Sequence, residues 1–95
     1  MARNVFVEIN LDSARTTDQL HDLLRDRLGF PGWYGKNWDA FLDSISGLIE
    51  MPEELRFIGW NSFNHRLPID AGLMKSCLDQ MSQELPELSS RVEYV

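Results

Sequence analysis

Two aspartates, Asp39 and Asp43, are the residues of this 95-residue chain whose type and spacing suggest chemistry. They lie in the segment WYGKNWDAFLDSISG, which runs from Trp33 to Gly47 and joins an aromatic, glycine-rich loop to a predicted helix. Residues at positions i and i+4 are neighbours on a helix surface, and two like charges there repel by roughly 0.2–0.5 kcal/mol. An unfavourable pair of this kind needs a reason, and we interpret the segment as a surface that binds a partner.

The helix that positions these carboxylates is expected to run from about Trp38 to about Leu48, because Asn37 before it is a good N-cap residue. At about 100° per residue, its apolar side chains form a stripe roughly 120° wide that should pack on a core. The members of this stripe are Trp38, Phe41, Leu42, Ile45, Leu48 and Ile49. Asp39 and Asp43 lie off the stripe, and Glu50 would extend the acidic line if the helix continues that far.

A structural interpretation competes with the functional one at each of these positions. Asp39 falls in the first helical turn, where the helix dipole favours a negative charge. Asp43 is too deep in the helix for that effect, and a solvated surface aspartate is its alternative. Trp33 and Tyr34 precede the helix in a segment punctuated by proline and glycine, so we expect at least one ring to be only partly buried. Core packing is the alternative for either ring.

Composition indicates one globular domain, residues 1–95, and a basic partner. Apolar residues make up 43% of the chain, which is enough for one small core and leaves no room for a second domain. Fifteen acidic and nine basic residues give a net charge of −6. This charge disfavours contact with nucleic-acid phosphates or anionic membranes and favours a cationic protein partner.

The single cysteine and the absence of long apolar runs bear on the compartment. Cys77 is the only cysteine, so an intramolecular disulfide is impossible, and we expect the thiol to be a small core residue. No apolar run approaches the roughly 18 residues of a membrane span, and the first residues lack a secretory signal. We therefore expect the chain to reside in the cytoplasm.

Strand and helix patterns alternate along the rest of the sequence. Val5, Phe6, Val7 and Ile9 fit a buried strand over Asn4 to Asn10, and the residues from Asn10 to Thr16 are expected to form a loop. Thr16 and Gln19 have the spacing of a capping box, and the helix after them should end at Gly29. The later elements are a strand over Leu55–Trp60, a helical turn within Asn61–Arg66, a helix over about Asp70–Leu85 and a strand over Arg91–Val95.

The late helix carries a second apolar stripe, roughly 140° wide, which predicts core packing. Its members are Leu73, Met74, Cys77, Leu78, Met81 and Leu85. The last strand could pair with the first. Strands that alternate with helices favour a small parallel sheet, because parallel neighbours need a long crossover connection.

Catalysis is the competing function for the acidic helix, with Asp39, Asp43, Glu50, His21 or His65 as the candidate groups. Two carboxylates act as general acid and base when they face each other across a cleft, but these two share one helix face. The sequence has no phosphate-binding glycine loop, no metal-ligand spacing of cysteine and histidine, and no nucleophile with an evident base. We therefore predict that the chain is not an enzyme and uses no cofactor or metal, and we expect His21 to be a packed or surface helix residue.

From Leu20 to Gly47, the sequence also resembles the barstar family of intracellular ribonuclease inhibitors. The likeness consists of a tyrosine, a glycine, an asparagine and two aspartates one helical turn apart, with flanking residues at matching positions. These positions are Leu20, His21, Pro31, Tyr34, Gly35, Asn37, Asp39, Ala40, Asp43 and Gly47. Outside this stretch the likeness is limited to the order of the elements.

The resemblance implies a barstar-like α/β fold, a small three-stranded parallel sheet packed with about three to four helices. It implies that the acidic helix and the preceding loop plug the active site of a ribonuclease. Such a site is lined with cations that hold phosphate, and carboxylates can take the phosphate positions. Asp43 matches the central acidic anchor, Asp39 the second carboxylate, and Trp33 and Tyr34 the aromatic pair. The other matching contact or backbone positions are Gly35, Asn37, Ser46 and Gly47.

Several departures from the family pattern bear on the choice of partner. Lys36 stands where an acid is found, Trp33 replaces a tyrosine, and Leu42 and Leu48 replace tryptophans. A further acidic contact from the late helix falls on Gln83 or Glu84. A different nuclease or another toxin is therefore an open alternative, as is an interaction or immunity module of the same fold with a non-nuclease target. The aromatic loop could also support a homodimer in the absence of a target.

Overall fold

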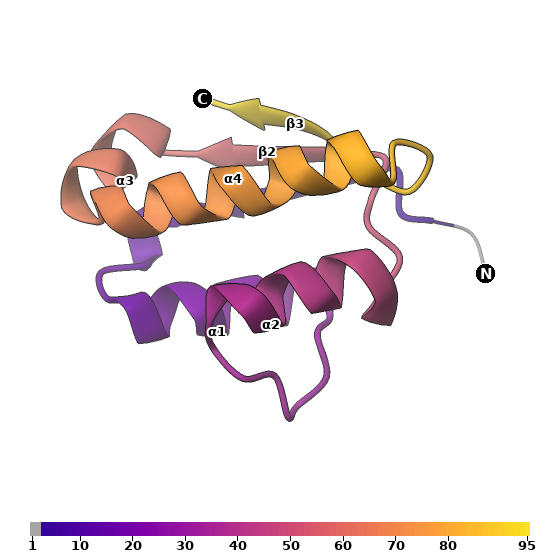
Figure 1. The fold of residues 1–95 in the computed structure, drawn as a ribbon. Coiled ribbons are helices and arrows are strands. Elements are labelled where there is room, and N and C mark those ends of the chain that lie inside the picture. Colours follow the sequence, from indigo (N-terminus) through magenta and orange to yellow (C-terminus); the bar gives the residue numbers. More distant parts are fainter. Residues whose placement is uncertain (1–2) are drawn as a thin grey trace.

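The computed structural model describes residues 3–95, in which a three-stranded parallel sheet lies beside a layer of helices (Figure 1). The strands are β1 (Phe6–Asn10), β2 (Glu54–Ile58) and β3 (Arg91–Tyr94), in the order β1-β2-β3. This confirms the predicted α/β fold with a small parallel sheet. The pairing of the last strand was predicted wrongly, because β3 pairs with β2 and not with β1. The central strand of the sheet is β2, and its Leu55 and Phe57 are fully buried.

The helices follow the predicted order. They are α1 (Thr17–Leu28), α2 (Trp38–Asp43), α3 (Trp60–Arg66) and α4 (Pro68–Glu84). A short 3-10 turn, η1 (Leu11–Ser13), occupies the segment expected to be a loop, and a π-helical segment, η2 (Ser44–Leu48), continues α2. In Figure 1, α4 runs lengthwise over the sheet, α1 and α2 lie below it, and the loop between α1 and α2 hangs at the bottom. None of the helices in residues 3–95 combines the length and apolarity needed to cross a bilayer.

The sheet buries one face and exposes the other. The covered face carries Ile9 in β1 and Leu55 and Phe57 in β2. On the open face, Arg56 of β2 lies within 3.5 Å of Glu8 and 3.6 Å of Glu93, so charges pair across all three strands. The first strand was expected to be a buried run, but Val5 before it is 67% exposed and Ile9 is its only fully buried residue. The reason is that β1 is an edge strand with one covered face.

The ends of α1 confirm the capping signals. The Thr16 side chain accepts a hydrogen bond from the Gln19 amide at 3.1 Å. The Gln19 side chain in turn accepts one from the Arg15 amide at 2.9 Å. Gly29 closes the helix in the left-handed conformation at φ 76°, which glycine adopts without steric cost. A second left-handed glycine, Gly59 at φ 79°, ends β2, so Trp60 begins α3 and does not extend the strand as predicted.

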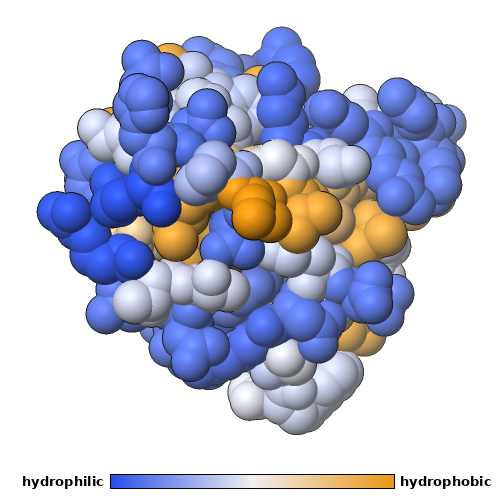
Figure 2. All heavy atoms as spheres, turned by 60° about the vertical axis from the view of Figure 1, so that its left-hand side comes forward, coloured by the Kyte–Doolittle hydropathy of each residue, from blue (hydrophilic) through white to orange (hydrophobic). Residues whose placement is uncertain are grey.

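The stripe of α4 is narrower than predicted. Its fully or nearly fully buried residues are Ala71, Met74, Leu78 and Met81, whereas Cys77 and Leu85 are half-buried. Leu73 is exposed, contrary to the prediction, because it lies at the edge of the strip that meets the sheet. Ile69, at the beginning of α4, is exposed as well. Figure 2, turned toward this end of the molecule, shows apolar atoms near the middle of a mainly hydrophilic face.

Candidate protein-binding site

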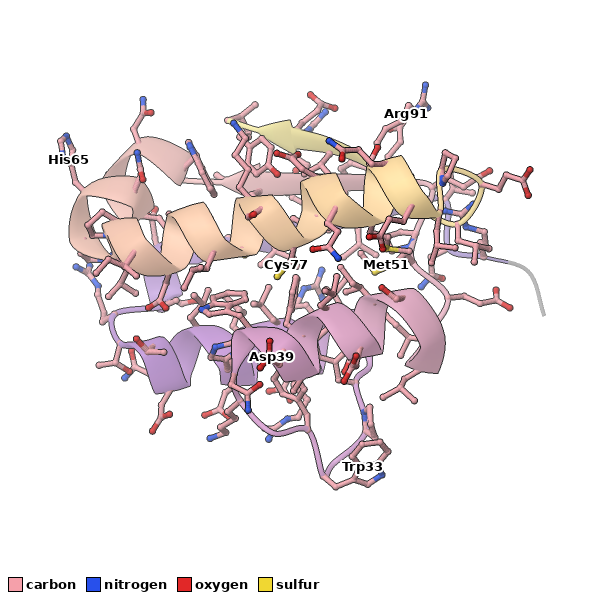
Figure 3. All side chains as sticks on the ribbon, in the orientation of Figure 1. Trp33, Asp39, Met51, His65, Cys77 and Arg91 are labelled. Atoms are coloured by element: carbon pink, nitrogen blue, oxygen red, sulfur yellow. The ribbon has the colours of Figure 1, made fainter. Side chains whose placement is uncertain are left out.

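Asp39 and Asp43 both project into solvent from α2. Within residues 3–95, neither carboxylate makes a hydrogen bond or an ion pair. Figure 3 shows Asp39 on the side of α2 that faces the viewer, in front of the helix axis. The two carboxylates are therefore free to bind cations on another molecule. We call the surface formed by Asp39 and Asp43 the acidic ridge.

Hydrogen bonds on both sides hold the first turn of α2 in place. The Asn37 side chain accepts a hydrogen bond from the Ala40 amide at 2.7 Å, which confirms the predicted N-cap. Trp38 donates its indole hydrogen to Asp70 of α4 at 3.1 Å, and the other Asp70 oxygen accepts one from Thr17 of α1 at 2.6 Å. Asp70 thus ties α1, α2 and α4 together. No local pattern in the sequence predicts this role, because the partners are 32 and 53 residues away along the chain.

The underside of α2 anchors the ridge in the core. Phe41 and Ile45 are buried, and Trp38, Leu42 and Ile49 pack partly buried against them. Leu48 was predicted to complete this stripe, but it is 48% exposed. The cause is the π-helical segment η2, in which each residue turns through a smaller angle than in an α-helix, so the later side chains leave the predicted face. The same segment buries Ser44, leaves Ser46 half-buried and exposes Gly47.

The two aromatic rings of the loop point in opposite directions. Trp33 is 73% exposed and lies at the tip of the loop in Figure 3, whereas the Tyr34 side chain is only 6% exposed. Tyr34 packs with its ring centroid 4.8 Å from that of Phe30. Its hydroxyl lies 2.7 Å from Nδ1 of His21, a fully buried residue of α1. Tyr34 therefore supports the loop from inside, and Trp33 is the ring available to a partner.

Lys36 connects the loop to α1. It adopts φ 53°, an uncommon left-handed conformation for a residue other than glycine. Its ammonium lies 2.8 Å from the Asp22 carboxylate on α1. This hydrogen bond from Lys36 lowers the pKa of Asp22 below its ordinary value. The positive charge of the loop therefore has an internal anionic partner.

An open groove of about 400 Å³ runs between the loop and α2 with η2. Its walls consist of loop residues on one side and helix residues on the other, with Asp43 among them. The lining residues are Trp33, Tyr34, Gly35, Ala40, Asp43, Ser44, Gly47 and Leu48. Apolar atoms form most of the exposed lining. The structure thus places a free carboxylate beside an apolar groove.

The other candidate catalytic groups do not meet the acidic ridge. His21 is buried, and His65 lies on α3 at the upper left of Figure 3, away from Asp39. The described part of the chain, residues 3–95, contains no group of three or more histidine, cysteine or acidic side chains that could hold a metal ion. Glu50 is exposed, beyond the end of η2. Of the late-helix candidates, both Gln83 and Glu84 are exposed, and Glu84 accepts a hydrogen bond from Gln80 at 3.2 Å.

Taken together, the fold and the site describe a small α/β protein that exposes Asp39 and Asp43 on α2 and Trp33 in the loop before it. Comparison with known proteins gives the family. The model of the family described as Barstar (barnase inhibitor) matches residues 4–94, and the chain belongs to this family. It is 32% identical over 68 residues to the "Putative ribonuclease inhibitor YrdF" of Bacillus subtilis (strain 168), covering 72% of this chain and 75% of that protein. Proteins of the barstar family are inhibitors and not enzymes, so this chain is a barstar-like inhibitor.

Proposed function

We propose that this protein blocks the active site of a ribonuclease with the acidic ridge of α2 and the loop that precedes it. The observation that carries the proposal is the exposure of Asp39 and Asp43, which have no internal partner within residues 3–95. A ribonuclease active site holds phosphate with cationic side chains, and the two carboxylates supply equivalent negative charge. In this proposal Asp43 is the central anchor and Asp39 the second contact.

The rigidity of the ridge favours tight binding. Asn37 caps the helix, Asp70 holds its first residue, and Phe41 with Ile45 anchors its underside. Binding therefore requires little ordering of the backbone, which keeps the entropic cost of association low. Gly35, Ser46 and Gly47 carry short side chains or none around the ridge, so a partner can approach the backbone at these positions.

The groove beside Asp43 supplies an apolar contribution to the same interface. Trp33 and Leu48 flank it and remain accessible. Large aromatic side chains at the centre of an interface account for a large share of binding energy. Lys36 would repel a cationic partner if its charge were unpaired, but Asp22 at 2.8 Å offsets it. The proposed partner is accordingly a basic protein whose cations meet Asp39 and Asp43 and whose apolar surface covers Trp33.

A pull-down followed by a nuclease assay tests this proposal. The immobilised chain captures its partner from cell extract, and the released partner is assayed on RNA with increasing amounts of free inhibitor. We expect ribonuclease activity in the released fraction and its loss at a one-to-one ratio, with purified barnase as a second probe. Capture of a protein without nuclease activity would contradict the proposal.

A further inference from the structure

The outer edge of β3 carries backbone groups that residues 3–95 leave without a hydrogen-bond partner. The Arg91 amide donates to the Glu53 carbonyl oxygen at 2.8 Å, so the backbone of Arg91 points toward β2. Backbone groups alternate in direction along a strand, and those of Val92 and Tyr94 therefore point away from β2. No hydrogen bond from the described residues reaches them on this side. An edge of this kind is a template for a further strand.

The opposite edge of the sheet is protected by a cation. The Val5 carbonyl oxygen accepts from the Glu54 amide at 3.0 Å, so by the same alternation the backbone of Glu8 points away from β2. Arg27 of α1 donates to this Glu8 carbonyl oxygen at 2.8 Å. Covering an edge with a charged side chain is a common protection against unwanted pairing. The two edges therefore differ, and β3 is the one open to a second strand.

The surroundings of β3 leave space for such a strand. Figure 1 shows β3 at the top of the molecule, with no helix drawn beyond it. On the covered side of the sheet, an open groove of about 460 Å³ lies between β3 and α4. The half-buried side chains of Val92 and Tyr94 line this groove. A neighbouring strand can therefore reach the edge without displacing α4.

The open face of the sheet carries charges that alternate in sign. Glu8, Arg56 and Glu93 occupy paired positions on the three strands, and Arg56 lies within 3.5 Å of Glu8 and 3.6 Å of Glu93. In the neighbouring row, Arg91 of β3 forms an ion pair with Glu54 of β2. Figure 3 shows the Arg91 side chain directed away from the ribbon at the top of the molecule. Arg91 and Glu93 are both exposed, so β3 brings one charge of each sign to the edge.

These charges select one way of pairing β3 with a copy of itself. In an antiparallel pair centred on Val92, the two Val92 residues exchange both backbone hydrogen bonds across a two-fold axis. Arg91 of each copy then lies opposite Glu93 of the other, and Tyr94 lies opposite Ser90. A centre one residue away would place Glu93 opposite Glu93, or Arg91 opposite Arg91. Like charges directly opposite each other are unfavourable, so the Val92 register is favoured over both neighbours.

We propose that β3 is a self-association edge, through which two copies of this chain form an antiparallel two-fold dimer with one continuous sheet. The alternating charges then cross the contact without a break: Glu8, Arg56 and Glu93 of one copy are followed by Arg91 and Glu54 of the other. The net charge of −6 on each copy opposes association. At physiological ionic strength this repulsion is screened beyond about 8 Å, whereas the paired side chains are in contact. A contact of one short strand gives a dimer that depends on concentration.

The dimer keeps the two proposed binding faces apart. Figure 3 shows Arg91 at the top of the molecule, Asp39 on α2 below it and Trp33 at the bottom. Each copy therefore keeps its acidic ridge accessible, and the dimer presents two of them. This consequence rests on the proposed function, whereas the self-association does not.

Sedimentation equilibrium of the full chain at physiological ionic strength tests the dimer. The wild type should change from monomer to dimer between about 1 μM and about 1 mM. Glu93→Arg creates two repulsive pairs with Arg91, and Arg91→Glu creates two with Glu93. We expect each variant to lower the association constant by at least about tenfold. An equimolar mixture of the two variants should form a heterodimer, because every pair across the contact then has opposite charges.

Glu8→Arg is the matched control for Glu93→Arg. Both glutamates contact Arg56 on the open face, and both substitutions change the net charge by the same amount. Glu8 lies on β1, away from the proposed contact, so this variant should associate as the wild type does. An equal loss of association in Glu8→Arg and Glu93→Arg would contradict a contact through β3.

Val92→Pro covers the case in which the charge-reversed variants do not fold. The Val92 amide points outward, so proline removes a hydrogen bond of the dimer and none of the bonds to β2. Edge strands tolerate proline in this orientation. We expect a circular dichroism spectrum like that of the wild type, and a monomer at every concentration.

Three results would overturn the proposal. The first is a wild type that stays monomeric up to about 1 mM. The second is a dimer that persists in both Glu93→Arg and Val92→Pro. The third is a dimer that is retained in Glu93→Arg but lost in Trp33→Ala, because self-association would then belong to the aromatic loop.

Light scattering with the captured ribonuclease separates this inference from the proposed function. We expect two ribonuclease molecules on each wild-type dimer and one on each Val92→Pro monomer. If no ribonuclease binds while the wild type dimerises as described, the proposed function fails and the self-association edge stands. If ribonuclease binds but the wild type is monomeric at every concentration, the inference fails and the proposed function stands.

Discussion

At the residue scale, the side chains of the proposed binding face divide into exposed ones and ones that hold the face together. Asp39, Asp43 and Trp33 are exposed. Tyr34 is buried and Asp70 half-buried, and both act within the protein. Substitutions in the first group should change binding without changing stability, and substitutions in the second should change both.

Asp43→Ala tests the first group. Because Asp43 is exposed and without an internal partner in residues 3–95, its loss should leave the melting temperature nearly unchanged. As a hot-spot anchor it should cost at least about 2 kcal/mol of binding free energy, measured by calorimetry with the captured ribonuclease. Asp79→Ala is the matched control, since it removes the same charge from an exposed position on α4. A large loss of stability with normal binding would refute the assignment.

Tyr94→Phe tests a buried hydroxyl away from the site. The Tyr94 Oη atom is buried without a hydrogen-bond partner in residues 3–95, so its removal should leave the stability at pH 7 unchanged or slightly higher. Burial raises the pKa of Tyr94 from 10.0 to about 12. The unfolded chain therefore releases this proton more readily, and the wild type should lose stability as pH rises from 10.0 through about 12. Denaturant unfolding should show a smaller alkaline loss for the variant than for the wild type.

At the scale of the element, α2 and η2 form one continuous helical segment with two kinds of backbone geometry. The α-helical part presents Asp39 and Asp43 at regular spacing, and the π-helical part turns Gly47 and Leu48 outward. The groove beside Asp43 exists because of this change, since Gly47 and Leu48 form part of its wall. Irregular helical segments of this kind often occur at functional sites.

Asn37→Ala tests the cap of this element. The Asn37 side chain accepts from the Ala40 amide at 2.7 Å, and the loss of an N-cap costs about 1 kcal/mol of stability. Partner binding should weaken as well, because the first turn carries Asp39. Thermal unfolding and calorimetry measure the two effects. Asn37→Asp is the control that keeps an N-cap acceptor, and it should restore most of the stability. Equal losses in both variants would contradict the capping argument.

At the scale of the whole molecule, charge and layer arrangement govern how a partner approaches. The net charge of −6 attracts a basic protein over a distance longer than the contacts themselves. The helices cover one face of the sheet, and the open face is occupied by paired charges around Arg56. The free carboxylates of α2 are thus presented on a different side from the paired charges of the sheet.

Salt dependence of association tests the electrostatic component. Charges are screened over about 10 Å at an ionic strength of 0.1 M, so the association rate with a basic ribonuclease should fall steeply as salt increases. Stopped-flow fluorescence of the tryptophans measures this rate. The dissociation rate should change much less, because contacts within the complex are shielded from ions. An association rate that is independent of salt would count against an acidic docking face.

The amino-acid sequence by itself determined the order of the elements, the ends of α1, the cap of α2 and the exposure of the acidic ridge. These features depend on interactions within a few residues: Thr16 with Gln19, Asn37 with Ala40, and the helical spacing of Asp39 and Asp43. Local hydrogen bonds and periodicity depend on residues that are close together in the sequence, so they could be predicted. The stretch from Leu20 to Gly47 resembles the barstar family, and this local resemblance predicted the family in the same way.

Only the tertiary structure decided which strand takes the centre, how far the core stripes extend and what supports the loop. The contacts of Asp70 with Thr17 and Trp38, and of His21 with Tyr34 and Trp38, join elements that the sequence does not place side by side. The π-helical turn at Ser44–Leu48 likewise changes which side chains face outward without any proline or glycine signal at its start. These features depend on packing between distant segments, and that packing exists only once the chain has folded.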